Sequence, residues 1–185
     1  TLLASSAASD VYKRQEYVIG TRRGISNRKP IIGQYDINRE GSRDMYSKGA
    51  NLLHTIRQLA NDDELWRQTL RGLNKEFYHS TVTTVEIEKY ISKSIGMDLS
   101  KVFDQFLRDY KVPVFEYEIT NGILMYRWNN VIDGFDMPLE VIIDGENTLL
   151  YPTLEFKRIP IKNLYINVDD DYYIFKKDLK IVIDS

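Results

Sequence analysis

The apolar residues of this chain change their spacing once, at Pro113, and this change limits the possible folds more than any other feature. Between residue 42 and that proline, apolar side chains recur every three or four residues, which is typical of amphipathic helices. Residues 115–119 instead alternate apolar and acidic side chains, and Asn121 and Gly122 then form a dipeptide that favours a two-residue hairpin turn. Helices followed by strands predict an α+β fold in which the two kinds of element are segregated.

Four amphipathic helices are predicted between residues 42 and 111. Thr83 and Glu86 have the spacing of a capping box, in which each side chain bonds the backbone of the other residue at a helix start. The predicted starts of the four helices lie at Ser42, within Asn61–Glu64, at Thr83 and at Asp98.

The predicted buried faces of these helices follow from the same spacing. The apolar stripe of the first helix includes Met45, Gly49 and Leu53, and the stripe of the fourth helix extends as far as Tyr110. Gly49 is expected to permit close packing of a neighbouring helix, and Lys48 is expected to be an exposed or paired charge.

About seven short strands are predicted after Pro113, separated by turn residues. Their number and length favour a small antiparallel β-sandwich over residues 113–185. The last of these predicted strands spans 179–183, where Leu179, Ile181 and Ile183 recur at every second position.

The overall charge and residue content exclude several kinds of function. The 25 basic and 27 acidic side chains give a net charge of −2, which provides no electrostatic reason to expect nucleic acid as a partner. No apolar run approaches the roughly 20 residues that cross a bilayer, so no membrane span is expected. The chain has no cysteine, which excludes a disulfide, a thiolate nucleophile and zinc binding through sulfur.

Few residues outside the helices have a pattern that indicates chemistry. The two histidines, His54 and His79, do not form a His-Glu-x-x-His motif, and we expect His54 to be a satisfied residue in mid-helix. Three consecutive aspartates at 169–171 lack the spacing of a calcium loop and are interpreted as a solvated turn. Residues 16–41 predict a helix end followed by a long irregular loop. Its basic side chains are interpreted as solvated; they are Arg22, Arg23, Arg28, Lys29 and Arg39, with Arg43 just beyond.

The segment Tyr46–Leu53, with the sequence Tyr-Ser-Lys-Gly-Ala-Asn-Leu-Leu, resembles a signature of the aminopeptidase N family of zinc aminopeptidases, which are thermolysin-like gluzincins. In that family a Tyr-x-Lys-Gly-Ala segment opens a helix downstream of the zinc motif. The likeness covers most of residues 40–112. It continues through Arg57–Leu59, Asp62–Glu64, Thr81–Thr84 and Phe103–Leu107.

The resemblance implies a specific organisation. Residues 16–112 are expected to be the helical C-terminal part of a peptidase catalytic domain, and 113–185 the β-sandwich domain that follows it. The His-Glu-x-x-His motif and the remaining zinc ligand of the family are expected upstream of Glu16. The parent protein is therefore expected to bind zinc and peptide substrates in a shorter, bacterial-type architecture, whereas this chain holds no zinc. Its own partner would be the missing N-terminal half.

The resemblance assigns one catalytic residue to this chain, Tyr46. When water attacks a peptide carbonyl, negative charge grows on the carbonyl oxygen, and a donor aimed at that oxygen stabilises the transition state. A phenol, with an ordinary pKa of about 10, can donate this hydrogen bond without ionising.

Two further expectations complete the sequence interpretation. Asp10–Gln15 resembles the translation of a transposase end sequence used in DNA library preparation, so residues 1–15 are expected to be a sequencing artefact or disordered. An alternative to the peptidase is a non-catalytic module, or a pseudoenzyme, in which the helices and the sandwich bind a protein or a carbohydrate. The upstream sequence separates these two hypotheses, because only the peptidase requires a His-Glu-x-x-His motif there.

Overall fold

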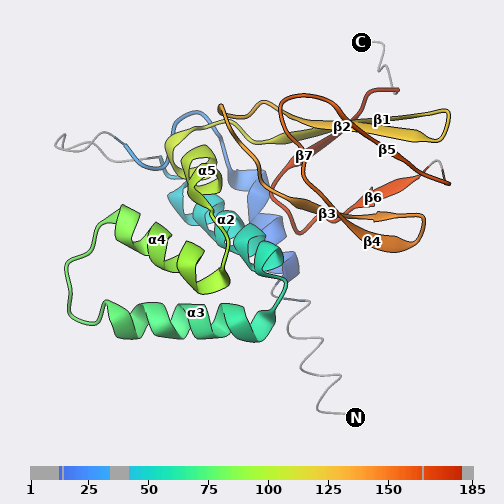
Figure 1. The fold of residues 1–185 in the computed structure, drawn as a ribbon. Coiled ribbons are helices and arrows are strands. Elements are labelled where there is room, and N and C mark those ends of the chain that lie inside the picture. The colour runs from blue at the N-terminus through green and yellow to red at the C-terminus, as the bar shows by residue number, and fades with distance from the viewer. Residues whose placement is uncertain (1–12, 14, 34–41, 164, 181–185) are drawn as a thin grey trace.

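The computed structural model of the chain describes residues 13, 15–33, 42–163 and 165–180. The expectation for residues 1–15 falls almost entirely outside these ranges, and the two residues of it that are described, Lys13 and Gln15, are helical, as are the residues that follow as far as Gly20. A helical part precedes two β-sheets, as the sequence predicted, so the chain has an α+β fold (Figure 1).

Besides the helical residues around 15–20, the described part of the chain has four α-helices and two short helical turns before the sheets. Figure 1 shows α2 and α5 nearer to the sheets than α3 and α4. No helix in the described ranges is long and apolar enough to cross a membrane. The elements are η1, a 3₁₀ turn (Thr21–Gly24), α2 (Met45–Ala60), α3 (Asp63–Glu76), α4 (Thr84–Ile95), α5 (Ser100–Phe103) and η2, a π-helical turn (Asp104–Arg108).

The predicted capping signals are confirmed for α3 and α4, whereas α2 begins at Met45 and not at Ser42. Asp62 accepts hydrogen bonds from the first amides of α3, and the Thr83–Glu86 capping box at α4 has both of its bonds. Gly96 ends α4 with a φ of 71°, a left-handed conformation that glycine adopts at little cost.

The end of the fourth predicted helix is a correction. η2 ends at Arg108, and Tyr110 is 46 % exposed and does not belong to the buried stripe. Asp109 has an extended backbone, and its carboxylate accepts a hydrogen bond from the amide of Lys111. This local bond gives the backbone an alternative to a further helical turn.

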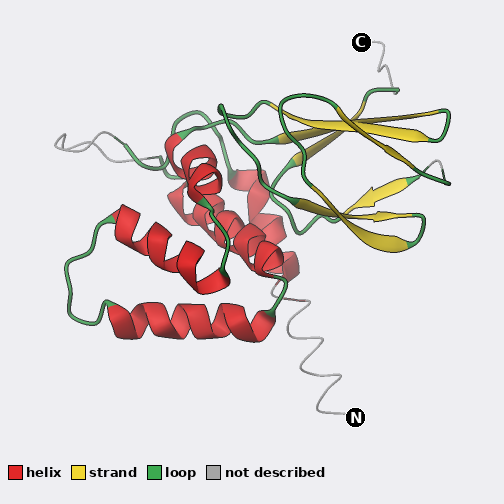
Figure 2. Ribbon diagram, viewed as in Figure 1, coloured by secondary structure: helices red, strands yellow, loops and turns green. Residues whose placement is uncertain are grey.

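Seven strands in the described ranges form two sheets that face each other (Figure 2). One sheet has the order β5-β2-β1-β7 and the other the order β4-β3-β6. The strands are β1 (Val114–Thr120), β2 (Ile123–Asn129), β3 (Leu139–Ile143), β4 (Glu146–Leu150), β5 (Lys157–Pro160), β6 (Ile166–Val168) and β7 (Phe175–Asp178).

The prediction that every strand pairs antiparallel is wrong for β7, which runs parallel to β1. The chain crosses from one sheet to the other before each of the last three strands, so no tight hairpin fixes the direction of β7. The prediction of a strand at 179–183 is also displaced, because β7 ends at Asp178. Residues 181–183 lie outside the described residues.

A single apolar core joins the helices to both sheets. Phe106 from the helical part, Trp128 from β2 and Leu139 from β3 are all fully buried in it. The indole of Trp128 donates to the carbonyl of Met137 at 3.0 Å, so its polar atom is satisfied inside the core. The helical part and the sheets are therefore packed as one body and not only joined by the chain.

Glu116 holds the three neighbouring strands β2, β1 and β7 together. Its carboxylate is 2 % exposed and pairs with Arg127 at 2.8 Å and Lys177 at 3.1 Å, which lie directly opposite it on the two flanking strands. Asn129 adds a third hydrogen bond at 2.9 Å. Burial raises the pKa of Glu116, but these hydrogen bonds outweigh it and hold the pKa below its ordinary value.

We expect Glu116→Gln to lower the free energy of unfolding at pH 7 by about 1–3 kcal/mol, since hydrogen bonds to a charged group are lost. A depressed folded pKa stabilises the fold above the unfolded pKa, about 4.3, and this contribution disappears as the pH falls through the folded pKa. Urea unfolding at pH 7 and pH 3 should therefore show a difference from wild type that shrinks in acid. Glu118→Gln, on the same strand, is the control. An equal difference at both pH values would contradict the assignment.

Candidate functional site

Tyr46 lies in the first turn of α2, at the surface of the helical part. Its side chain is 79 % exposed, and no residue in the described ranges hydrogen-bonds to the hydroxyl. Met45 and Leu53, at 43 % and 40 %, are also exposed, so the expectation that they belong to the buried stripe is wrong. The helix buries Leu52 and Ile56 instead, because the core lies on that side.

The side of α2 that faces away from Tyr46 has a row of buried polar residues next to the apolar stripe. Asp44, Lys48, Asn51 and Thr55 follow one another at intervals of four, three and four residues, which places them on one helix face. Each is at most 5 % exposed. Each also bonds to residues outside α2, and together they reach three segments of the chain, so this polar row fixes α2 relative to the segments around it.

Asp44 connects the start of α2 to the segment 25–27. One carboxylate oxygen accepts the amide of Ser26 at 3.0 Å, and the other accepts the amide of Asn27 at 2.8 Å. The Ser26 hydroxyl donates to the same carboxylate. Burial raises the pKa of Asp44, but the hydrogen bonds from Ser26 and Asn27 hold it below its ordinary value.

Lys48 is fully buried, which corrects the expectation of an exposed or paired charge. Its ammonium donates to the backbone carbonyls of Asp109 and Tyr110, at 3.1 and 3.3 Å. Burial lowers the pKa of Lys48, and the nearby carboxylates of Asp109 and Asp44 offset part of this. Lys48 thus fastens the segment that follows η2 onto α2.

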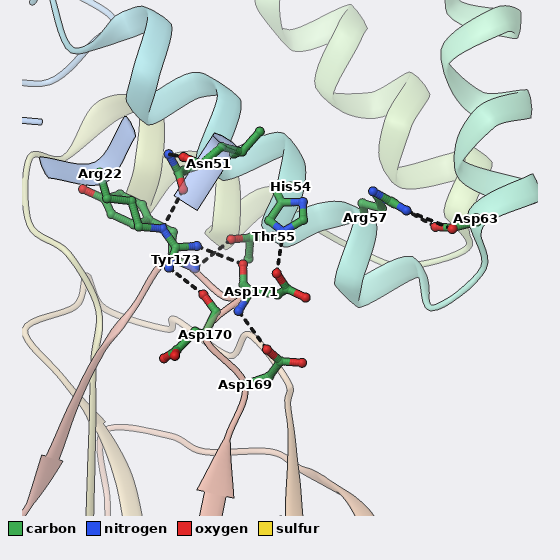
Figure 3. A network of polar contacts seen from close by, with 11 residues as sticks. Arg22, Asn51, His54, Thr55, Arg57, Asp63, Asp169, Asp170, Asp171 and Tyr173 are labelled. Atoms are coloured by element: carbon green, nitrogen blue, oxygen red, sulfur yellow. Dashed lines mark hydrogen bonds and ion pairs between the residues drawn. The ribbon is translucent and has the colours of Figure 1, made fainter. Parts of the chain in front are cut away.

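Arg22 is not a solvated loop residue, which corrects a second expectation. Its guanidinium donates to the Asn51 side chain at 2.6 Å and to the backbone carbonyls of Asp170 and Asp171 (Figure 3). It also lies over the ring of Tyr173, 5.4 Å from the centroid. Arg22 therefore joins the N-terminal segment, α2 and the connection between β6 and β7.

The three aspartates form part of that connection, which we define as the hook, residues 169–174. His54 from α2 lies 2.9 Å from a carboxylate oxygen of Asp171, and the amide of Tyr173 donates to the hydroxyl of Thr55 at 2.9 Å (Figure 3). The solvated-turn interpretation was therefore incomplete, because Asp171 contacts α2. His54 is 7 % exposed and has a partner, as expected.

The described residues provide no place for a catalytic metal. No three histidine, cysteine, aspartate or glutamate side chains among them lie close enough to hold an ion. His79 is exposed in the connection after α3 and forms an aromatic contact with Tyr78. Residues of this part of the chain therefore do not fit a zinc site.

Gly49 does not have the packing role that we expected. A β-carbon at Gly49 would meet no described atom within 4 Å, whereas one at Gly72 would overlap the hydroxyl of Tyr90. Gly72 in α3 is the glycine that allows two helices, α3 and α4, to approach closely.

A half-open groove of about 800 Å³ lies between residues 15–23 and the sheet formed by β3, β4 and β6. Its lining includes Arg23, Glu140 and the aspartates of the hook, but not Tyr46. The candidate site at Tyr46 is an exposed surface at a helix start and lies outside this groove.

A scan against models of known protein families and a search of curated protein sequences find no match for this chain. Solved structures do match, among them that of Legionella pneumophila aminopeptidase A in complex with aspartic acid. The TM-score is 0.54 at 14 % sequence identity, and the match covers 72 % of this chain and 18 % of the Legionella chain. The chain therefore shares its fold with part of an aminopeptidase and spans under a fifth of that enzyme's length.

We expect Thr55→Val to lower the free energy of unfolding by about 1–3 kcal/mol, because it leaves the buried amide of Tyr173 without an acceptor. Chemical denaturation of the chain measures this change, and Thr55→Ser should restore most of the loss. Thr69→Val is a matched control, since the Thr69 hydroxyl, also buried, only donates to the Leu65 carbonyl of its own helix. Equal losses for both valine variants would contradict the role of Thr55.

Proposed function

We propose that the chain is the C-terminal part of a zinc aminopeptidase and that Tyr46 donates a hydrogen bond to the oxyanion formed during peptide hydrolysis. The observation that carries this proposal is the exposed phenol at the start of α2, in a fold shared with part of an aminopeptidase. The Tyr-x-Lys-Gly-Ala segment supports it further, because the tyrosine of that segment is the one at this helix start.

The geometry suits a donor that acts on a group outside this chain. The phenol hydroxyl has no partner among the described residues, so it is free to reach an incoming carbonyl oxygen. The backbone that supports it is held by the buried bonds of Asp44 and Lys48. A donor that is fixed before the reaction stabilises developing charge without reorganising at that moment.

The zinc ligands and the general base belong to the upstream half in this proposal. That half would dock on the side of α2 where Tyr46 and Leu53 are exposed, and peptides would bind between the two halves. Zinc would supply charge to polarise the peptide carbonyl, and Tyr46 would donate a hydrogen bond to the same oxygen.

The helical part and sandwich also fit the alternative, a non-catalytic module or pseudoenzyme. An uninterrupted copy of the gene decides between them directly. The peptidase requires a His-Glu-x-x-His motif in frame upstream of Glu16, and its absence there would favour the module.

In the full-length parent, Tyr46→Phe is expected to lower kcat on an aminoacyl chromogenic substrate by about 100-fold or more, the usual effect of removing one oxyanion donor. KM and the zinc content should stay close to wild type, because the phenol acts in the transition state and does not bind the metal. Steady-state kinetics and metal analysis of the same preparation measure both.

Tyr78→Phe is the matched control for this variant. Tyr78 is 72 % exposed in the connection after α3, so its substitution removes a hydroxyl of similar exposure away from α2. Unchanged turnover in Tyr46→Phe, or an equal fall in both variants, would remove the assignment of Tyr46.

A further inference from the structure

We propose that the β-sandwich positions Tyr46 through three residues, Tyr173, Asn27 and Asp44, which together link the hook to the first turn of α2. This inference rests on the proposed function, since it names residues that orient the same phenol. None of the three touches a substrate in this proposal, so they are positioning residues and not catalytic ones.

The first link is between the hook and the segment 25–27. Tyr173 is 4 % exposed, and its amide is bonded to Thr55, so its ring has a fixed place beside α2. Its hydroxyl accepts a hydrogen bond from the Asn27 side chain at 2.9 Å. The Asn27 side-chain oxygen is buried without a partner in the described ranges. Tyr173 is therefore the one described residue that hydrogen-bonds to the side-chain amide of Asn27.

The second link is between Asn27 and Asp44. Asn27 has a φ of 49°, a left-handed conformation that turns the chain at this position. The backbone N–H of Asn27 donates to the carboxylate of Asp44 at 2.8 Å. Ser26 donates two further bonds to the same carboxylate from its amide and hydroxyl. The segment therefore meets Asp44 with three donors.

The third link is the start of α2 itself. Asp44 is the residue that precedes the helix, and aspartate is among the best residues for capping the first amides of a helix with its side chain. Here the carboxylate makes no capping bond and binds the segment 26–27 instead. The carbonyl of Asp44 still accepts the amide of Lys48 at 2.7 Å.

The first turn of α2 therefore depends on this external bond for its stability. Helix ends open more readily than helix interiors, because their first amides lack partners within the helix. Tyr46 is in that turn, two residues after Asp44, so opening of the turn would move the phenol. A displacement of about 1 Å at a reacting group costs up to about 100-fold in rate. The sandwich, through Tyr173, thus reduces the opening of the first turn of α2, which contains Tyr46.

Tyr173→Phe tests this inference, because it removes the hydroxyl and keeps the ring against Arg22 and the core. In the 185-residue chain, hydrogen exchange of the amides at 48–50, which bond to the carbonyls of the first turn, should become about fivefold faster, the factor expected for one lost hydrogen bond. Exchange at 56–59, in the second half of α2, should stay at the wild-type rate. A general loss of stability would raise both sets together.

Tyr172→Phe is the matched control. Tyr172 is equally buried and next in sequence, and in the described ranges its hydroxyl is not bonded to the segment 25–27. Its substitution should leave exchange at 48–50 unchanged. Asp44→Asn is a second variant, which should accelerate exchange at 48–50 more than Tyr173→Phe does. No acceleration in either variant, or the same acceleration in Tyr172→Phe, would overturn the inference.

The zinc-loaded parent provides a second readout. Tyr173→Phe should lower kcat about tenfold with KM unchanged, and Tyr172→Phe should leave both near wild type. A large fall in Tyr46→Phe with no fall in Tyr173→Phe would refute the positioning role and leave the proposed function standing. No fall in Tyr46→Phe would refute the proposed function, whatever the exchange data show.

Discussion

The buried polar row on α2 is the interaction on which the rest of the arrangement depends. A buried polar group costs free energy unless it is hydrogen-bonded, so Asp44, Lys48, Asn51 and Thr55 each require a partner at one position. Their partners come from the N-terminal segment, the segment after η2 and the hook. Apolar packing alone tolerates small shifts, whereas these directional bonds fix how the three segments meet the helix.

This arrangement leaves α2 with two different sides. One side is occupied by the core and by the polar row, and the other exposes Tyr46 and Leu53. Tyr46 therefore combines an exposed side chain with a backbone that is fixed by the buried hydrogen bonds of Asp44 and Lys48. An oxyanion donor requires both properties, because it must reach a substrate from a fixed place.

Features that depend on neighbouring residues were predictable from the sequence. The capping box of Thr83 and Glu86 and the hairpin between β1 and β2 follow from residues a few positions apart. The exposed position of Tyr46 in the first turn of α2 is compatible with the site that the resemblance assigned, although its catalytic role remains a prediction.

Features that depend on distant residues were not predictable in the same way. Lys48 was expected to be an exposed or paired charge, since lysine is rarely buried, and only the carbonyls of Asp109 and Tyr110, some 60 residues away, satisfy it. The parallel direction of β7 likewise depends on its route from the other sheet. A signal for the polar row was present, since polar residues at 44, 48, 51 and 55 have helical spacing, but such a row is ordinarily a solvated face.

The central claim is that the Tyr46 hydroxyl reaches the oxyanion of a bound peptide, and a structure of the zinc-loaded parent with a phosphinic peptide tests it most directly. The anionic phosphinyl oxygen of this inhibitor stands in for the oxyanion. The account predicts that the Tyr46 hydroxyl lies within about 2.5–3.0 Å of that oxygen, the range of O–H···O hydrogen bonds. A hydroxyl that is turned away, or separated from the inhibitor by another part of the protein, would contradict it.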